Sequence, residues 1–387
     1  MNTWKVPLAA VRVTDEDVAS VVDVYRSGWL TMGSRTEEFE DALREYAGVD
    51  HCLAVSSCTA ALHLIARAAG IGPGDQVIVP SMTFVATANA VAYTGADPVF
   101  AEIAAIDRPW LSAEAAEAAI SERTKAILTV SYGGHPGEIE ALRDLAERRG
   151  LVLLEDNAHG LGSWAGGRHL GSFGLAGALS FSAGKNLGVG EGGAILSDDA
   201  ALADRVRRMR WHGITVSTWD RHRALVGSYG VDELGFNYRI DDPRSALAAS
   251  RLERLDEDNR SRAWIDSFYR SELSGFEELV PTVAPPDDER SSHCMFTVVL
   301  AEQVDRDGFR RSLAEQGVQT SVSFPPVHRF PLYADSGARL PLTDAYSRST
   351  VSLPIFPGME DWQQELVVEA IGRTLRPKSR QAAARAR

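Results

Sequence analysis

The chain has 387 residues, a length that suggests two domains, one larger than the other. Apolar residues make up 44% and charged residues 24%, which is ordinary for a globular enzyme and excludes a disordered or fibrous chain. The formal net charge is −13, so general nucleic-acid binding is not expected.

The termini and the cysteines bear on the cellular compartment. No apolar segment of the signal-peptide type opens the chain, and no run of 18 apolar residues occurs in it, so we expect no membrane association. Cys52, Cys58 and Cys294 show no metal-ligand spacing and cannot all pair, which favours a reducing, cytoplasmic location and no metal site. Residues 376–387 carry five basic and no acidic side chains, and we interpret them as a solvated, disordered tail.

Helical and strand patterns alternate over the first half of the chain. The spacing of apolar residues predicts helices over 36–47, 58–70, 83–95, 113–121 and 137–150. Short apolar runs predict strands over 51–57, 75–81, 97–103, 125–132 and 151–156. This βαβα order indicates an α/β fold, with a mainly parallel sheet covered by helices on both faces.

The pattern changes in the second half. Strands over 177–182 and 192–199 and a helix over 200–213 precede a polar, irregular stretch, 214–235, which is a candidate substrate-facing loop. A helix over 243–256 follows, and strands over 293–302 and 317–324 then flank a further helix. We therefore predict a large domain over 1–254 and a smaller α+β domain over 255–375.

Lysine is rare in this chain, which makes each lysine informative. Only four of the 40 basic residues are lysines: Lys5, Lys125, Lys185 and Lys378. Lys185 lies in a glycine-rich loop between two apolar runs, where the alternative is an ordinary exposed loop lysine. Arginine carries the same charge but cannot supply the unprotonated primary amine that forms a Schiff base.

Two segments carry groups that suit a phosphorylated ring. Ser56 to Thr59 fall between a strand and a helix, where backbone N–H groups and the helix dipole favour a phosphate, although a simple helix cap is the alternative. Asp156 ends a buried strand, where open α/β sheets place ligands. Its carboxylate could pair with a protonated ring nitrogen and His159 with a ring oxygen, or both could be structural.

Two further segments complete the set. Ser180 ends a strand five residues before Lys185, and Phe84 follows the strand over 75–81, where it could stack on a planar cofactor or belong to the core. A phosphate site, an acid for a ring nitrogen, an aromatic ring and a loop lysine are together the requirements of pyridoxal 5′-phosphate (PLP).

Many segments, in the right order, resemble the DegT/DnrJ/EryC1/StrS family of PLP-dependent sugar aminotransferases. The resemblance covers nearly the whole chain and includes residues 27–40, 56–64, 70–91, 95–103, 153–174, 179–199, 235–242, 325–328 and 352–357. It implies a fold type I transferase, with a large α/β/α domain and a smaller C-terminal α+β domain.

The resemblance also implies roles for individual residues. Lys185 would bind PLP as a Schiff base, Asp156 the pyridine nitrogen and His159 the 3-hydroxyl group. The remaining cofactor contacts would come from the backbone at Cys58, the hydroxyls of Thr59 and Ser180, and the ring of Phe84. Asn237 would reach the phosphate of the partner subunit, which implies a homodimer with shared active sites, and His328 would lie near the substrate.

The same resemblance indicates the reaction. Related dehydratases replace the lysine by histidine, so Lys185 implies transamination. Residues 153–174 and 209–222 look most like the branch that acts on 4-keto nucleotide sugars, and Arg221 in this region is a candidate substrate contact. We therefore expect transfer of the amino group of L-glutamate to C4 of dTDP-4-keto-6-deoxyglucose.

Three alternatives remain from the sequence. The chain could aminate a 3-keto sugar or a cyclitol ketone, or it could be a non-catalytic PLP-binding regulatory protein. A nicotinamide oxidoreductase is disfavoured, because the glycine-rich stretch 188–193 precedes a strand and does not open a βαβ unit.

Overall fold

The computed structural model describes residues 4–215, 228–285 and 289–375. Arg221 and the predicted tail over 376–387 lie outside these residues. Within them, no helix is long and apolar enough to cross a membrane.

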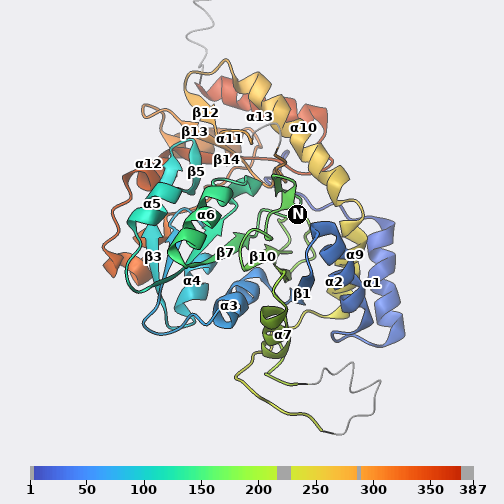
Figure 1. The fold of residues 1–387 in the computed structure, drawn as a ribbon. Helices are drawn as coiled ribbons and strands as arrows, with labels where there is room; N and C mark the ends of the chain where they lie inside the picture. Colours follow the sequence, from blue (N-terminus) through green and yellow to red (C-terminus); the bar gives the residue numbers. More distant parts are fainter. Residues whose placement is uncertain (1–3, 216–227, 286–288, 376–387) are drawn as a thin grey trace, which may run out of the picture.

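A seven-stranded sheet in the order β1-β11-β10-β7-β6-β2-β3 forms the centre of the molecule (Figure 1). The four pairs from β10 to β3 are parallel, whereas β11 runs antiparallel to both β1 and β10. The predicted mainly parallel sheet is thus confirmed. Its strands are β1 (His51–Val55), β2 (Gln76–Pro80), β3 (Asp97–Ala101), β6 (Thr124–Val130), β7 (Val152–Asn157), β10 (Ala176–Ser180) and β11 (Gly193–Ser197).

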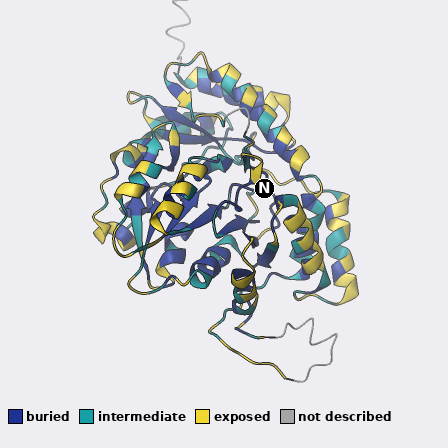
Figure 2. Ribbon diagram, in the orientation of Figure 1, coloured by how far each residue is buried: buried dark blue, intermediate teal, exposed yellow. Residues whose placement is uncertain are grey.

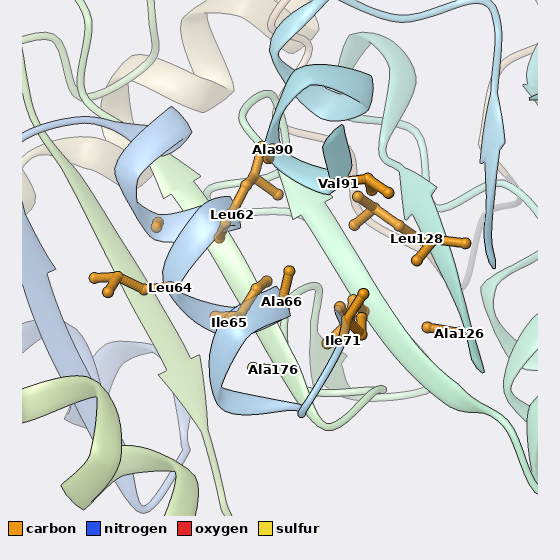
Figure 3. Packing of buried hydrophobic residues seen from close by; sticks show 14 of the residues in the cluster. Leu62, Leu64, Ile65, Ala66, Ile71, Ala90, Val91, Ala126, Leu128 and Ala176 are labelled. Atoms are coloured by element: carbon orange, nitrogen blue, oxygen red, sulfur yellow. The ribbon is translucent and has the colours of Figure 1, made fainter. Parts of the chain in front are cut away.

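Amphipathic helices pack on this sheet and turn their polar faces to solvent (Figure 2). Leu62, Ile65 and Ala66 of α3 pack against Ala126 and Ala176 of the sheet, in the cluster shown in Figure 3. The helices are α1 (Asp15–Ser27), α2 (Ser34–Ala47), α3 (Cys58–Ala68), α4 (Ala86–Ala92), α5 (Ala113–Ala118), α6 (Ile139–Arg149), α7 (Ala200–Met209) and α9 (Asp242–Leu252).

Several short elements lie in the segments that connect the strands of this sheet. They form two small antiparallel pairs and one 3-10 turn: β4 (Ile103–Ala105) with β5 (Arg108–Leu111), β8 (Trp164–Ala165) with β9 (Arg168–His169), and η1 (Tyr132–Gly134).

A second hydrophobic core surrounds a three-stranded antiparallel sheet, β12-β13-β14. Val6 from the start of the chain is buried in it beside Tyr269 and Phe296, so this core is not built from the C-terminal part alone. The division of the chain at 254/255 stays a prediction. The elements here are α10 (Leu255–Leu273), β12 (Leu279–Pro281), β13 (Phe296–Leu300), α11 (Arg306–Glu315), η2 (Val327–Arg329), η3 (Pro331–Ser336), α12 (Pro341–Ser349), β14 (Thr350–Leu353) and α13 (Asp361–Leu375).

The stretch 317–324 is not the continuous strand that its alternating pattern predicts. Its backbone bonds go to different neighbours: the Gln319 N–H donates to the Val6 carbonyl at 2.9 Å, and the Ser321 N–H to the Ser352 carbonyl at 3.2 Å. Since no single strand runs alongside it, only isolated bridges form.

Asp17 joins α1 to α9 and is buried. Its Oδ2 lies 3.1 Å from Arg251 Nε and 2.7 Å from Arg254 Nη2. Burial alone would raise the pKa of Asp17, but the bonds from Arg254 and Thr14 lower it to about 2. The stabilisation is therefore present above the unfolded pKa of about 4 and is lost as the pH falls towards 2.

We expect Asp17→Ala to reduce the free energy of unfolding by about 3–5 kcal/mol at pH 7, because two arginines lose their anion. Urea denaturation of the variant and of Asp23→Ala, an exposed acid on the same helix, measures the effect. The difference from wild type should shrink near pH 2; an equal loss in both variants at pH 7 would contradict this role.

Candidate active site

A cavity of about 420 Å³ lies at the carboxyl ends of β7 and β10, beside the N-terminus of α3. It is lined by seven side chains from four separate segments that the sequence analysis selected: Cys58, Thr59, Phe84, Asp156, His159, Ser180 and Lys185. The fold thus brings together the groups that a phosphorylated ring requires.

The N-terminus of α3 opens into this cavity. The first N–H groups of a helix have no partner within the helix, and Ser57 Oγ takes only the one from Ala60, at 3.1 Å. Gly193, the first residue of β11, lets this strand pass close to the helix end, since a Cβ there would lie 2.6 Å from the Cys58 nitrogen. The N–H groups of the first turn, with the Thr59 hydroxyl, suit an anion such as phosphate.

Asp156 is buried, and hydrogen bonds fix both of its carboxylate oxygens. Oδ2 accepts from the Thr87 hydroxyl at 2.6 Å, and Oδ1 accepts from the Ala158 N–H at 3.1 Å. The Cys58 thiol lies 3.9 Å from Oδ1. Burial raises the pKa of Asp156, while the Thr87 bond, the Ala158 bond and the charge of Lys185 oppose it, so a cationic N–H in the cavity would complete this site.

The adjacent carboxylate, Glu155, has a different task, because successive side chains of a strand face opposite sides. It accepts the N–H groups of Gly171 and Phe173, both at 2.7 Å, and that of Gly174 at 2.9 Å. Glu155 therefore fixes the loop before β10, whereas Asp156 faces the cavity.

His159 is buried beside Asp156 and its ring stacks on Phe324, with centroids 6.0 Å apart and planes at 6°. Burial and the charge of Lys185 lower the pKa of His159 well below its usual value, so the ring is neutral. The Gly133 N–H donates to Nδ1 at 3.4 Å. The proton then belongs on Nε2, which can donate to an oxygen.

Lys185 and Phe84 line the cavity from two separate segments, the loop after β10 and the segment after β2. Lys185 is partly buried, and its backbone N–H donates to the Ser182 carbonyl at 2.9 Å, which closes the loop after β10. Phe84 is 59% exposed and meets Phe324 edge-on at 5.9 Å. Such an exposed aromatic ring at a cavity mouth is available to a planar ligand.

Two predicted residues, Asn237 and His328, do not line this cavity. Asn237 is exposed, and Arg239 Nε donates to its Oδ1 at 3.2 Å. His328 is buried, with Nδ1 2.7 Å from Ser81 Oγ and Nε2 3.5 Å from Asp344 Oδ1. Arg221 lies outside the described residues.

The sequence analysis missed several groups of the site. Thr83 and Phe324 line the cavity, and Thr83 Oγ1 lies 2.7 Å from Thr87 Oγ1. The spacing of four residues between these two threonines would fit one face of the predicted helix over 83–95, but Thr83 precedes α4, so this contact is not one between neighbours on a helix. No local signal marked Phe324, which comes from the far end of the chain.

The set of groups fits PLP chemically. A buried carboxylate that forms no ion pair within the described part of the chain suits a protonated pyridine nitrogen, a helix N-terminus suits the phosphate, and a neutral histidine N–H suits the ring oxygen. The Lys185 amine is the nucleophile that an aldehyde carbon requires.

Comparison with known proteins identifies the family of the chain. The profile of the DegT/DnrJ/EryC1/StrS aminotransferase family matches residues 11–372. The chain is 36% identical to the spore coat polysaccharide biosynthesis protein SpsC of Bacillus subtilis over 379 residues, which are 94% of this chain and 96% of SpsC.

Solved structures show the same fold. DesV of S. venezuelae, crystallised with a ketimine intermediate, has a TM-score of 0.88 and 36% identity, over 96% of this chain and 98% of DesV. The sugar aminotransferase Spr1654 of Streptococcus pneumoniae, in its PLP form, has a TM-score of 0.87 and 25% identity, over 96% and 97% of the two chains. The chain therefore belongs to the DegT/DnrJ/EryC1/StrS aminotransferase family and is a PLP-dependent sugar aminotransferase of fold type I.

Proposed function

We propose that this enzyme transfers the amino group of L-glutamate to C4 of a keto sugar nucleotide, dTDP-4-keto-6-deoxyglucose. The observation that carries the reaction type is the single cavity shared by Lys185, Asp156 and His159. The choice of sugar rests on the resemblance of residues 153–174 and 209–222 to the 4-keto branch. The three described cysteines are all free, which supports a cytoplasmic location.

In this proposal the residues of the cavity divide the work. Asp156 would accept the N–H of the ring nitrogen and keep it protonated, and Nε2 of His159 would donate to the ring oxygen. The N–H groups at Cys58 and Thr59, with the Ser180 hydroxyl, would hold the phosphate, and Phe84 would contact the ring. When bound, PLP supplies an electron sink for the negative charge that develops at Cα of the donor.

Lys185 has two tasks in this proposal. Its Nζ would hold the cofactor covalently in the resting enzyme. As a free amine it would take the proton from Cα of the donor as a general base and return a proton as a general acid. The sugar half-reaction runs the same proton transfers in reverse.

Thr87 should affect activity indirectly, because its hydroxyl holds the carboxylate of Asp156. Thr87→Val keeps the shape but removes the hydrogen bond to a buried carboxylate, worth about 1.5–3 kcal/mol, or roughly a 10- to 150-fold loss of kcat/KM. PLP affinity, measured by fluorescence titration of the apoenzyme, should fall as well. Thr87→Ser keeps the hydroxyl and should stay close to wild type; equal behaviour of the two variants would refute the role.

We further propose a homodimer with composite active sites, in which Asn237 reaches the phosphate bound by the partner subunit. Its exposure and its position outside the cavity support this arrangement. Mixed Lys185→Ala and Asn237→Ala preparations should then regain activity through hybrid dimers with one intact site. A fully active monomer in sedimentation would contradict it.

A substrate panel tests the proposed sugar. The purified enzyme is incubated with L-glutamate and 4-keto or 3-keto sugars linked to dTDP or UDP, or with a cyclitol ketone, and the product is identified by NMR. We expect amination at C4 of dTDP-4-keto-6-deoxyglucose. Amination of 3-keto sugars or of the cyclitol alone would overturn the choice of substrate but not the reaction.

A further inference from the structure

A second, smaller cavity of about 30 Å³ lies behind the Lys185 loop. Residues 9–12, the loop 183–188, helix α10 and residues 355–357 enclose it. Lys185 lines this cavity and also the larger one that contains Asp156, and it is the residue that the two have in common. A ligand group held here therefore lies beside the residue that also lines the larger cavity.

Arg262 of α10 lines the small cavity and forms no ion pair within 4.0 Å among the described residues. Its side chain is buried, at 6% exposure for the residue. Its recorded hydrogen bonds are long and go to its own helix, from Nη1 to the Asp258 carbonyl at 3.5 Å and to Asn259 Oδ1 at 3.4 Å. No carboxylate of the described residues lies within 4.0 Å of its guanidinium. Burial lowers the pKa of Arg262, but a guanidinium remains charged.

The neighbouring charges offset Arg262 only in part, because Asp258, which also lines the cavity and acts on Arg262, lies near Arg12 and Arg254 as well. Arg251 and Arg254 both pair with Asp17. Arg12 lies 3.5 Å from Glu257 and 3.7 Å from Asp258. With these three carboxylates included, the cations that line the cavity remain in excess: Arg12, Lys185, Arg251, Arg254 and Arg262. A buried charge without a partner is costly, so the cavity is suited to an anion.

We propose that Arg262 binds the α-carboxylate of the amino donor, L-glutamate, an inference that rests on the proposed function. The α-carboxylate is two bonds from the amino nitrogen that must reach Lys185, which lines both cavities. The planar guanidinium can hold both carboxylate oxygens at once. A cavity of about 30 Å³ admits a carboxylate but not a nucleoside diphosphate, which assigns Arg262 to the donor and not to the sugar.

Arg262→Gln and Arg262→Lys test this site, with Arg260→Gln as a matched control at an exposed position of the same helix. Calorimetry gives the dissociation constant of 2-oxoglutarate for the PLP-loaded enzyme, with which this keto acid does not react. Steady-state kinetics give KM for L-glutamate. Single turnover of the pyridoxamine-phosphate form with the keto sugar isolates the second half-reaction, and thermal unfolding checks that each variant folds.

We expect Arg262→Gln to raise both the dissociation constant and KM by about tenfold or more, because a charge-assisted bidentate bond is lost. Arg262→Lys, which keeps the charge without the planar fork, should fall between this variant and wild type. The sugar half-reaction and Arg260→Gln should change less than about twofold. Unchanged constants, or an equal loss in the sugar half-reaction, would overturn the proposal.

If Arg262→Gln does not fold, the proposal is tested with Arg262→Lys, by the dissociation constant of 2-oxoglutarate and KM for L-glutamate. Failure of the wild-type enzyme to accept L-glutamate would instead overturn the proposed donor. The two failures are therefore distinguishable.

Discussion

Lys185→Ala is expected to reduce turnover below a few per cent of the wild-type rate. Alanine has no amine to hold the cofactor covalently or to move the Cα proton. No other described lysine lines the cavity, since Lys125 lies exposed in β6 and Lys5 near the start of the chain. Steady-state kinetics check the rate, and borohydride reduction followed by mass spectrometry checks the covalent link to the peptide that contains Lys185.

Two further variants show whether activity depends on the amine of Lys185 or only on its positive charge. Lys185→Arg keeps the positive charge near Asp156 but lacks an amine that can lose its proton at neutral pH, so it should be as inactive as Lys185→Ala. Lys125→Ala removes an exposed lysine and should behave as wild type. More than a few per cent of the wild-type kcat in either Lys185 variant would exclude this residue as the catalytic amine.

The parts of the site that were predictable lie where local pattern and topology coincide. A buried apolar run ending in Asp156 had to be a strand, and the carboxyl ends of parallel strands share one edge of a sheet. The helix that starts at Cys58 was equally clear, because Ser57 is a good N-cap before an apolar helical stretch. These rules bring Thr59, Asp156 and Ser180 to one cavity without knowledge of the structure.

The parts that were not predictable depend on contacts between distant segments. Thr87 lies among small residues of α4, and only the structure shows its hydroxyl 2.6 Å from Asp156. Arg262 is one of 36 arginines, and only the packed structure shows that no described carboxylate pairs with it within 4.0 Å. Phe324 enters from a stretch that was predicted as a strand, but its neighbours in space are Phe84 and His159.

Helix boundaries also depend on tertiary contacts. The apolar pattern over 83–95 predicted one helix, but α4 covers only Ala86–Ala92. The segment before it leaves the end of β2 and directs Thr83 and Phe84 into the cavity. Helix propensity alone cannot locate the first residue of α4, because Thr83 and Phe84, which precede it, line the cavity and do not belong to the helix.

Asp156 should give the second large effect. We expect Asp156→Ala to lower kcat/KM at least about 100-fold, or about 3 kcal/mol, and to weaken PLP binding. The carboxylate is buried and fixed by Thr87 and Ala158, so its removal takes a positioned anion away from the ring nitrogen. Kinetics with L-glutamate and titration of the apoenzyme with PLP measure the two losses.

Asp156→Asn and Glu155→Gln show which property of the carboxylate matters. Asp156→Asn keeps the shape and one acceptor but not the charge, so it should lose nearly as much activity as Asp156→Ala if the charge keeps the ring nitrogen protonated. Glu155→Gln alters the next carboxylate along the strand, which holds the Gly171, Phe173 and Gly174 N–H groups; this variant should lose stability while it retains PLP. Wild-type activity and PLP affinity in Asp156→Asn would show that hydrogen bonding alone suffices, and the same result in Asp156→Ala would show that another group holds the ring nitrogen.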